Sequence, residues 1–439
     1  MLFLTVLCIS TASSAGEEQL SLRDCLLRAM RGNPEIRARG QGLLADQEDV
    51  RIARSFLLPK ITFEERFMRT NNPTYTFMAK LNQERFATED FDIHALNDPA
   101  PVSDFQTSVA FEQALFAPKA YIGRKMAEKE YEARREEVER KREDVAFMVF
   151  KTYLDVQTAR SFLAAADNGV NDAREHLRIA ESRYAAGLGL YSDALRAEVA
   201  VRIAEERKVT AEKNLLVARR ALGLMIGLSE SVDVDDERPA FMLNDLAYYS
   251  AAALSRKDLK GMEMRFRNAE NNLRLANASY LPVLGLGGSY QMNSNKAPLG
   301  EEGESWQAMA FLRWELFDGL KREAERAKAQ HKLAEAGEYL DGMKKQVSFE
   351  VYEAYLSVEE ARKGLELAKA NMAAAEEGRR LVRTRYEKSL SNMVDMLDVQ
   401  TSLDAARADV VAREAAYLTA LVRLSHQSGT ILKDLEIEP

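Results

Sequence analysis

The chain has very little cysteine and histidine. Its 439 residues contain two cysteines, and only Cys25 would remain after removal of an N-terminal signal, which excludes a disulfide framework. The four histidines show no metal-ligand spacing, and we expect surface positions for all of them: His94, His176, His331 and His426. These shortages leave no cysteine or histidine cluster for a metal site or a nucleophilic enzyme, so we expect no cofactor.

The sequence also lacks a long hydrophobic run and a basic charge balance. No stretch of eighteen apolar residues occurs beyond the N-terminus, so the chain offers no transmembrane helix. Its formal net charge of −8 argues against nucleic acid as a partner, because nucleic-acid binding requires a basic face. Charged residues make up 30% of the chain, a share that suits long helices with solvated faces.

The N-terminal segment predicts export. An apolar core over Leu2–Ile9 is followed by small residues that end at Ala15, a pattern typical of a secretory signal peptide over residues 1–15. The mature chain would then begin at Gly16. A buried N-terminal helix or strand is the alternative reading, and it stays open.

Proline is absent from residues 119–238 and again from residues 299–438. Because a proline costs about 3 kcal/mol inside a helix, both windows permit very long helices. A helix from about residue 120 to 186 would be about 100 Å long, and a rod of that length must pack against other rods. Apolar positions recur at a spacing of three to four in both windows: Val145, Val149, Thr152, Val156, Ala159 and Leu163, then Val347, Val351, Ala354, Val358, Ala361 and Leu365.

The two windows belong to an internal duplication. The phrase RYAAGLGLYSDALRAEVAV at residues 183–201 recurs in altered form at residues 385–403, a constant offset of 202 residues. At the same offset, Val145–Arg160 pairs with Val347–Arg362 without a gap, and half of the sixteen positions are identical. We expect repeat 1 over residues 16–235 and repeat 2 over residues 236–439. The acidic segment Ser229–Phe241 between them is expected to be a solvated linker.

Each repeat carries two stretches of period-2 alternation, near residues 60–69 and 105–116 and near residues 283–291 and 305–316. In the first stretch Ile61, Phe63 and Phe67 share one face, and the polar Thr62, Glu64 and Arg66 share the other. Leu284, Leu286 and Tyr290 form a similar apolar face in the second repeat. The length and alternation fit membrane-spanning β-strands, although a soluble sheet would look similar.

The duplicated phrase contains a helix break in each copy. Gly187, Leu188 and Gly189 interrupt the first copy, and Ser389, Leu390 and Ser391 interrupt the second. A break of this kind predicts two antiparallel helices joined by a turn. The constant offset places both turns at the same end of the molecule.

Acidic residues follow both breaks. Ser192 and Asp193 stand where a helix N-cap is expected. Asp395 and Asp398 are three residues apart, so they share one face of the last long helix. Favourable charge near a helix N-terminus would explain this pair, and a functional role is the alternative.

Taken together, these segments resemble the TolC family of bacterial outer-membrane efflux proteins. The likeness rests on several short stretches spread over nearly the whole mature chain: SLRDCLLRAMRGNPEI at the start, SFLLPKI and SYLPVL before the strands, LFAP and LFDG after them, and the two RY…D.L turns. The resemblance implies an α+β membrane protein. A long α-helical coiled-coil barrel would join a trimeric 12-stranded transmembrane β-barrel, with four strands from each chain.

The resemblance also implies a role for the turns and the residues beside them. The turns correspond to the periplasmic entrance, where the family meets an adaptor protein. Asp395 and Asp398 match an acidic pair that rings this entrance, and Tyr386 matches a tyrosine that holds neighbouring coils closed, with Asp193 as its partner. The family pattern has a basic residue where this chain has Ser391, and closure by hydrophobic residues such as Met393 is the alternative.

The function implied is an outer-membrane exit duct of a tripartite efflux or type I secretion system. It would work with a periplasmic adaptor, an inner-membrane transporter and outer-membrane lipid, and drugs, metal ions, metabolites and secreted proteins all stay open as cargo. A coiled-coil scaffold or periplasmic adaptor without a pore is the rival reading. Asp395 and Asp398 as an enzyme's acid–base pair lack any accompanying motif, so we expect no enzyme.

Overall fold

The computed structural model describes residues 19–237, 241–388 and 390–437, and the expected signal peptide lies outside these ranges. The chain divides into two compact units, each assembled from separate segments. The sheet unit comprises Gly42–Arg135 and Gly261–Leu340, and the helical unit comprises the described residues within 19–41, 136–260 and 341–437. Among the described residues, none of the helices combines the length and the apolar character needed to cross a membrane.

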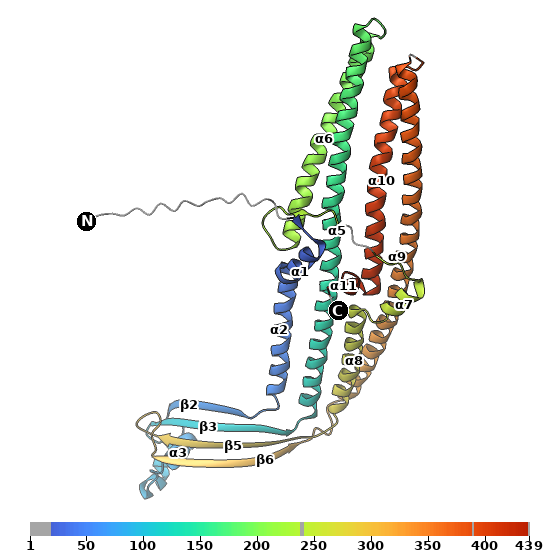
Figure 1. The fold of residues 1–439 in the computed structure, drawn as a ribbon. Helices are drawn as coiled ribbons and strands as arrows, with labels where there is room; N and C mark the ends of the chain where they lie inside the picture. The colour runs from blue at the N-terminus through green and yellow to red at the C-terminus, as the bar shows by residue number, and fades with distance from the viewer. Residues whose placement is uncertain (1–18, 238–240, 389, 438–439) are drawn as a thin grey trace, which may run out of the picture. The chain divides into compact units, whose positions relative to one another are not determined.

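The sheet unit contains a four-stranded antiparallel sheet (Figure 1). Its strands are β2 (Lys60–Thr70), β3 (Val102–Phe116), β5 (Val283–Ser294) and β6 (Gly303–Arg313), in the order β2-β3-β5-β6. Helix α2 (Pro34–Ser55) precedes β2, and α8 (Lys257–Ala278) precedes β5. Both repeats therefore follow the same helix–strand–strand–helix order.

The register of the sheet separates an apolar face from a polar face. Phe63 lies opposite Val109, Val109 opposite Tyr290, and Tyr290 opposite Trp306. The neighbouring row, one residue along, consists of Glu64, Ser108, Gln291 and Ser305. The predicted alternation is thus confirmed in these rows, whereas toward the end of β6 the apolar Met309 and Phe311 lie on the polar side, opposite Gly287 and Gly285.

Three charged residues depart from this pattern: Arg69 and Glu304 near the strand ends, and Glu65 within β2. Glu65 lies on the apolar face, where its carboxylate accepts a hydrogen bond of 2.5 Å from the Thr107 hydroxyl. Thr107 itself is buried beneath the turn between β5 and β6, whose Leu299 N–H donates to its Oγ1. This partly buried hydrogen bond provides a partner for a carboxylate that lies among apolar side chains.

Three strand boundaries differ from the prediction by three residues, and one of them is the end of β5 at Ser294 instead of residue 291. β3 begins at Val102, three residues earlier than expected, and β6 ends at Arg313 instead of near residue 316. After β6, Arg322 donates to the carbonyl oxygens of Glu315 and Leu316 at 2.8 and 2.9 Å. β6 ends where its partner strand begins, because Arg313 pairs with Val283, the first residue of β5, and the Arg322 side chain binds the carbonyl groups that follow.

The loop between β2 and β3 contains more structure than the irregular connection that its composition indicates. It forms α3 (Pro73–Asn82), a short 3₁₀ helix (Thr88–Phe91) and α4 (Ile93–Asn97). Asn72 caps α3 by accepting from the N–H groups of Thr74 and Tyr75, and Asp92 caps α4 in the same way.

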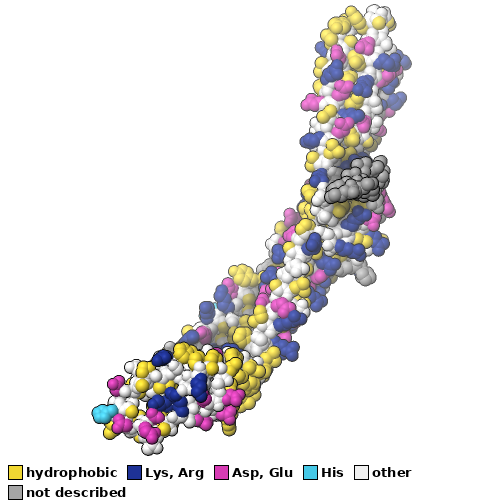
Figure 2. Space-filling model, turned by 90° about the vertical axis from the view of Figure 1, so that its left-hand side faces the viewer, with side chains coloured by type: hydrophobic (Ala, Val, Ile, Leu, Met, Phe, Trp, Pro, Cys, Tyr) yellow, Lys and Arg dark blue, Asp and Glu magenta, His cyan; other side chains and the backbone are white. Residues whose placement is uncertain are grey.

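Two long hairpins make up most of the helical unit, and the first helix of each begins within the residue ranges of the sheet unit. The first pairs α5 (Pro118–Ala185) with α6 (Tyr191–Met225), and the second pairs α9 (Lys321–Glu387) with α10 (Met393–Ser428). Short helices complete the unit: α1 (Leu22–Gly32), α7 (Leu246–Ala253) and α11 (Ile431–Asp434). In Figure 2, basic and acidic side chains are interspersed over the visible face of the helices, as expected for solvated rods.

The core of the helical unit uses the predicted apolar stripes. Val145, Val149 and Val156 are buried in one cluster, and Val347, Val351 and Val358 are buried in another. The expectation of a wholly solvated linker is wrong. Strand β4 (Asp233–Val234) lies in it and pairs in parallel with β1 (Gln19–Leu20). Asp233 is buried there because Arg160 and Arg219 both bond to its carboxylate.

Candidate functional site

The turns of the two hairpins lie at the same end of the helical unit (Figure 1) and follow the 202-residue offset. α5 ends at Ala185 and α9 at Glu387, while α6 begins at Tyr191 and α10 at Met393. In the first turn the N–H of Leu188 donates to the carbonyl of Arg183 at 2.8 Å, and in the second Leu390 donates to Arg385 at 2.8 Å. The duplication therefore extends to the hydrogen bonding of the turns.

In the first turn, two glycines allow the chain to reverse. Gly187 has a φ of +70°, which side chains disfavour, and a Cβ on Gly189 would lie 3.2 Å from the Cβ of Arg183. Leu188 follows at 71% exposure, so an apolar side chain projects from the tip into solvent.

The second turn is held by side chains that surround the N-terminus of α10. The Asn392 side chain accepts from the N–H of Asp395 at 2.8 Å, and the Asp395 carboxylate accepts from the Asn392 N–H and the Ser391 hydroxyl. Leu390 is 65% exposed at the position equivalent to Leu188. Ser389 lies outside the described residues.

The expected N-cap role of Ser192 and Asp193 is wrong. Leu190 is the N-cap of α6, and it makes no side-chain capping bond. Asp193 is instead the third residue of the helix, equivalent to Asp395 at the 202-residue offset. The first repeat has leucine where the second has the capping Asn392, so the two turns share a backbone path but differ in capping.

A small cluster joins the two hairpins near their turns. Tyr386 is 5% exposed and packs with Met393 and Met396 against three alanines of the first hairpin: Ala180, Ala194 and Ala197. Arg183 crosses from the first hairpin to donate to the carbonyl of Tyr386 at 2.9 Å, and its guanidinium lies 4.9 Å from the centre of the tyrosine ring. Arg183 was not among the predicted site residues, although the 202-residue offset places it opposite Arg385.

The predicted partner of Tyr386 lies nearby without bonding to it. Among the hydrogen bonds between described residues, none joins the Tyr386 hydroxyl to Asp193. Burial raises the pKa of Tyr386, the Arg183 charge opposes the rise, and the Asp193 charge adds to it. The hydroxyl therefore stays protonated at neutral pH and able to donate, and the pairing with Asp193 stays a prediction.

Asp395 and Asp398 share the exposed side of the first turns of α10. The hydroxyl of Ser391 and the backbone N–H of Asn392 lower the pKa of Asp395, so its carboxylate is charged at neutral pH. Helix capping accounts for Asp395 within one chain. Asp398 takes no part in that capping.

Two segments of the chain, residues 26–228 and 248–430, match the profile of the outer membrane efflux protein family. The chain belongs to this family. It is therefore a protein of the outer membrane of Gram-negative bacteria.

Two relatives of this efflux protein show partial sequence matches. Nodulation protein T of Rhizobium leguminosarum bv. trifolii is 21% identical over 295 residues, which cover 64% of this chain and 62% of that protein. Protein CyaE of Bordetella pertussis is 29% identical over 195 residues, which cover 44% and 41%. The chain thus spans less than two thirds of the length of either relative.

Two solved structures show the same fold over almost the whole efflux protein. A membrane protein from Pseudomonas aeruginosa has a TM-score of 0.80 at 21% identity and covers 93% of both chains. The CmeC outer membrane channel of Campylobacter jejuni has a TM-score of 0.77 at 14% identity, covering 98% of this chain and 94% of that one. The predicted combination of long helices and a four-stranded sheet is confirmed.

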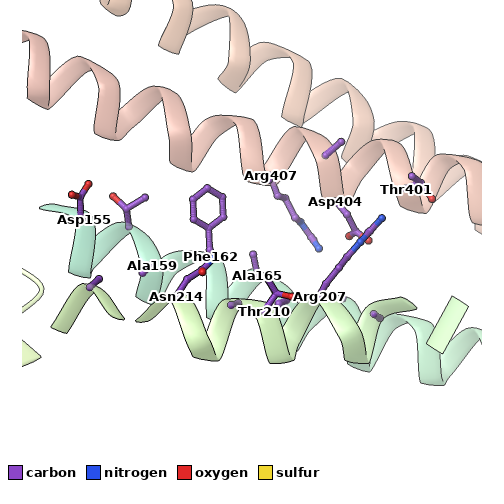
Figure 3. A pocket seen from close by; sticks show the side chains of 18 residues that line it. Asp155, Ala159, Phe162, Ala165, Arg207, Thr210, Asn214, Thr401, Asp404 and Arg407 are labelled. Carbon is purple, nitrogen blue, oxygen red and sulfur yellow. The ribbon is translucent and has the colours of Figure 1, made fainter. Parts of the chain in front are cut away.

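Away from the turns, the hairpins of the efflux protein are separated by open space. Two cavities of about 710 and 470 Å³ lie between the first hairpin and α10 and share Gly169, Arg207 and Asp404 in their lining. Figure 3 shows Phe162 projecting from α5 into the larger cavity and Arg207 reaching from α6 toward Asp404 of α10. Because small side chains line most of the cavities, few contacts join the hairpins over this stretch, whereas closer to the C-terminal end of α10 the buried Val145 and Val149 pack in one cluster with Val422.

A buried polar network supplies some of those contacts. Gln400 of α10 lies 3.3 Å from the Nε2 of His176 and donates to Asp172 at 3.1 Å, both on α5. Arg379 of α9 donates to Asp172 at 3.0 Å. The expectation of surface histidines is wrong for His176, which is 3% exposed, and for His426, which contacts Asp144 at 2.8 Å.

The buried histidine predicts acid sensitivity. Burial lowers the pKa of His176 in the folded protein, so the unfolded chain binds a proton at this imidazole more tightly than the folded chain does. The free energy of unfolding therefore falls as the pH drops below about 6.5, the usual pKa of histidine. We expect His176→Gln to keep an amide opposite Gln400 and to reduce this loss. The measurement is the thermal unfolding midpoint in detergent near neutral pH and about one unit below the histidine pKa. His94→Gln, at an exposed site, is the control, and equal acid sensitivity of the His176→Gln variant and the wild type would contradict the prediction.

Proposed function

We propose that three copies of this efflux protein pool their strands into one 12-stranded barrel and form the exit duct of a tripartite efflux or type I secretion system. The observation that carries the proposal is a sheet with two open edges: within the described residues β2 pairs only with β3, and β6 only with β5. Each unpaired backbone group costs several kcal/mol in lipid, so these edges must meet further strands. A closed ring of strands removes them.

The two faces of the sheet support a pore. The apolar face carries Phe63, Val109 and Trp306, which suit contact with lipid chains. The polar face carries Arg66, whose guanidinium bonds to Gln106, together with serines and amides that suit a water-filled lumen. A soluble scaffold would expose these contiguous apolar side chains to water, which soluble proteins rarely do.

The hairpin turns are proposed to contact a periplasmic adaptor that links the duct to an inner-membrane transporter. Exposed Leu188 and Leu390 occupy equivalent positions at the two tips, so the chain offers one repeated apolar contact. Figure 2 shows hydrophobic side chains at this end of the helices. The proposed contact surface consists of the six turn residues Gly187, Leu188, Gly189, Ser389, Leu390 and Ser391.

The periplasmic gate is proposed to lie beside these turns. Three chains around one axis would bring six carboxylates together from Asp395 and Asp398. Tyr386, Asp193 and the cluster around Met393 would hold each pair of hairpins closed. The sparse contacts along the two cavities support a gate in which the hairpins separate near their turns, while the apolar cluster that includes Val149 and Val422 stays packed farther from the turns.

Planar bilayers test the duct. We expect the purified protein to produce discrete conductance steps, because a closed ring of strands with a polar interior holds water. The control is the same preparation after heat denaturation. A native trimer that inserts into bilayers and carries no current under any applied voltage would contradict the proposal.

A further inference from the structure

The loop between β2 and β3 folds back over the polar face of the sheet. Gln83, which follows α3, donates to the carboxylate of Asp104 at 2.7 Å, and Asn293 donates to the same carboxylate at 3.0 Å. The register places Asp104 and Asn293 on the polar face, and all three side chains are buried. The C-terminal end of α3 is therefore anchored on the side of the sheet that faces the proposed pore.

A glycine permits the close approach of α3. A Cβ on Gly303, the first residue of β6, would lie 2.0 Å from the carbonyl oxygen of Asn82. Thr76 and Ala79 of α3 are buried as well. Within the loop, Lys80 pairs with Asp90 at 2.5 Å, so α3 is fixed to the rest of the loop as well as to the sheet.

The side of α3 away from the sheet is apolar and exposed. Tyr75, Met78 and Leu81 recur at a spacing of three and are 55%, 51% and 47% exposed. Since Thr76, Ala79 and Gln83 face the sheet, this row points toward the space enclosed by the polar face. An apolar row beside a water-filled lumen requires a partner.

The dimensions of a 12-stranded barrel supply that partner. Twelve strands about 4.8 Å apart and tilted by about 40° give a backbone diameter of about 24 Å. Three helices about 10–12 Å in diameter, packed around one axis, fill a circle of about 22–26 Å. In this arrangement each helix axis lies about 6–7 Å from the common axis and about 5–6 Å from the strand backbone, a separation that requires direct backbone contact of the kind that Gly303 allows.

We propose that the three copies of α3 in a trimer meet on its axis through Tyr75, Met78 and Leu81 and close the outer mouth of the pore. The closure rests on the proposed trimeric duct and adds a second barrier at the end opposite the periplasmic gate. Its position follows from the strand ends: α3 packs against Gly303, at the end of the sheet farthest from the long helices that follow β3 and β6. The turn between β5 and β6 takes no part, because it folds onto the apolar face.

Thiol labelling from outside the cell tests the closure without opening the periplasmic gate. Ser108→Cys places a thiol on the polar face beneath α3, and a bulky, membrane-impermeant polyethylene glycol maleimide is the probe. We expect slow labelling with the native loop. Combined serine substitutions at Tyr75, Met78 and Leu81 should raise the rate by more than about tenfold, because labelling follows the population of open mouths. The parent chain is the background control, since its Cys25 is buried and burial raises the pKa of this thiol to about 12.

A cross-link provides a second measurement. Met78→Cys in three copies at the axis should form a reducible dimer of chains under mild oxidation, because a disulfide requires Cα atoms within about 7 Å. Phe63→Cys, on the apolar face, should remain monomeric on a denaturing gel. The closure is wrong if the serine substitutions leave the labelling rate of Ser108→Cys unchanged. It is also wrong if Met78→Cys gives no cross-link in an intact trimer. In either case the proposed duct is unaffected. If no trimer forms, the duct itself is wrong.

Discussion

Replacing Leu286 with arginine is expected to remove most of the protein from the outer membrane. Leu286 lies on the apolar face, opposite Gln113 of β3 and Ala310 of β6, and is the fourth residue of the 12-residue strand β5. Arginine on the lipid face costs about 2–4 kcal/mol at the bilayer midplane and less toward the interface, so we expect a cost of about 2 kcal/mol here. The measurement is the yield of folded protein in the outer-membrane fraction.

Thr62→Arg is the matched control for this substitution. Thr62 lies on the polar face opposite Ala110, on the same side of the sheet as Arg66. A guanidinium there would remain in water, so the membrane yield should stay close to that of the wild type. Equal losses for the two variants would show that the apolar face does not contact lipid.

Removing the charges of Asp395 and Asp398 is expected to reduce the cation selectivity of the pore. Because Asp395 accepts capping hydrogen bonds, asparagine is the suitable replacement at both positions: it keeps an acceptor and removes the charge. A unit charge about 4 Å from a passing ion contributes about 1 kcal/mol in water, so we expect the cation-to-anion permeability ratio to fall about fivefold. The reversal potential across a salt gradient in planar bilayers measures it.

Asp409→Asn provides the same change of charge on the same helix, several turns from the tip, where the carboxylate pairs with Arg413. We expect its selectivity to remain that of the wild type. An unchanged reversal potential in the Asp395→Asn, Asp398→Asn variant would assign both carboxylates to helix capping and surface charge. The proposed acidic ring would then be wrong.

Much of the fold could be predicted because the sequence contains it twice. The 202-residue offset identified both hairpin turns, and the structure ends α5 and α9 and begins α6 and α10 at that spacing. The period-2 faces of the strands were equally clear, since alternation along one strand fixes which side chains share a face. Local patterns of this kind need no knowledge of distant contacts.

The strand ends and the linker depended on contacts that local patterns do not contain. β6 stops at Arg313 because its partner β5 begins at Val283, so the residues after Arg313 have no strand to pair with. Asp233 is buried because two arginines from other helices reach it. An acidic segment with such partners has the same composition as a solvated one.

The seam between the hairpins was harder still to predict. His176 and Gln400 meet across 224 residues, and their contact depends on how two helices align side by side. Neither the histidine nor the glutamine, considered alone in the sequence, indicates that such a contact exists. Asp193 and Asp395 occupy equivalent positions, yet only Asp395 joins a capping box, because the first repeat has Leu190 where the second has Asn392.

Native mass spectrometry in mild detergent tests most directly whether several chains close one barrel. Four strands with two open edges cannot enclose a pore, so we expect a complex of three chains that dissociates only when the sheet unfolds. The predicted spectrum contains a trimer and no folded monomer. A stable monomer with the narrow charge distribution of a folded protein would contradict the account.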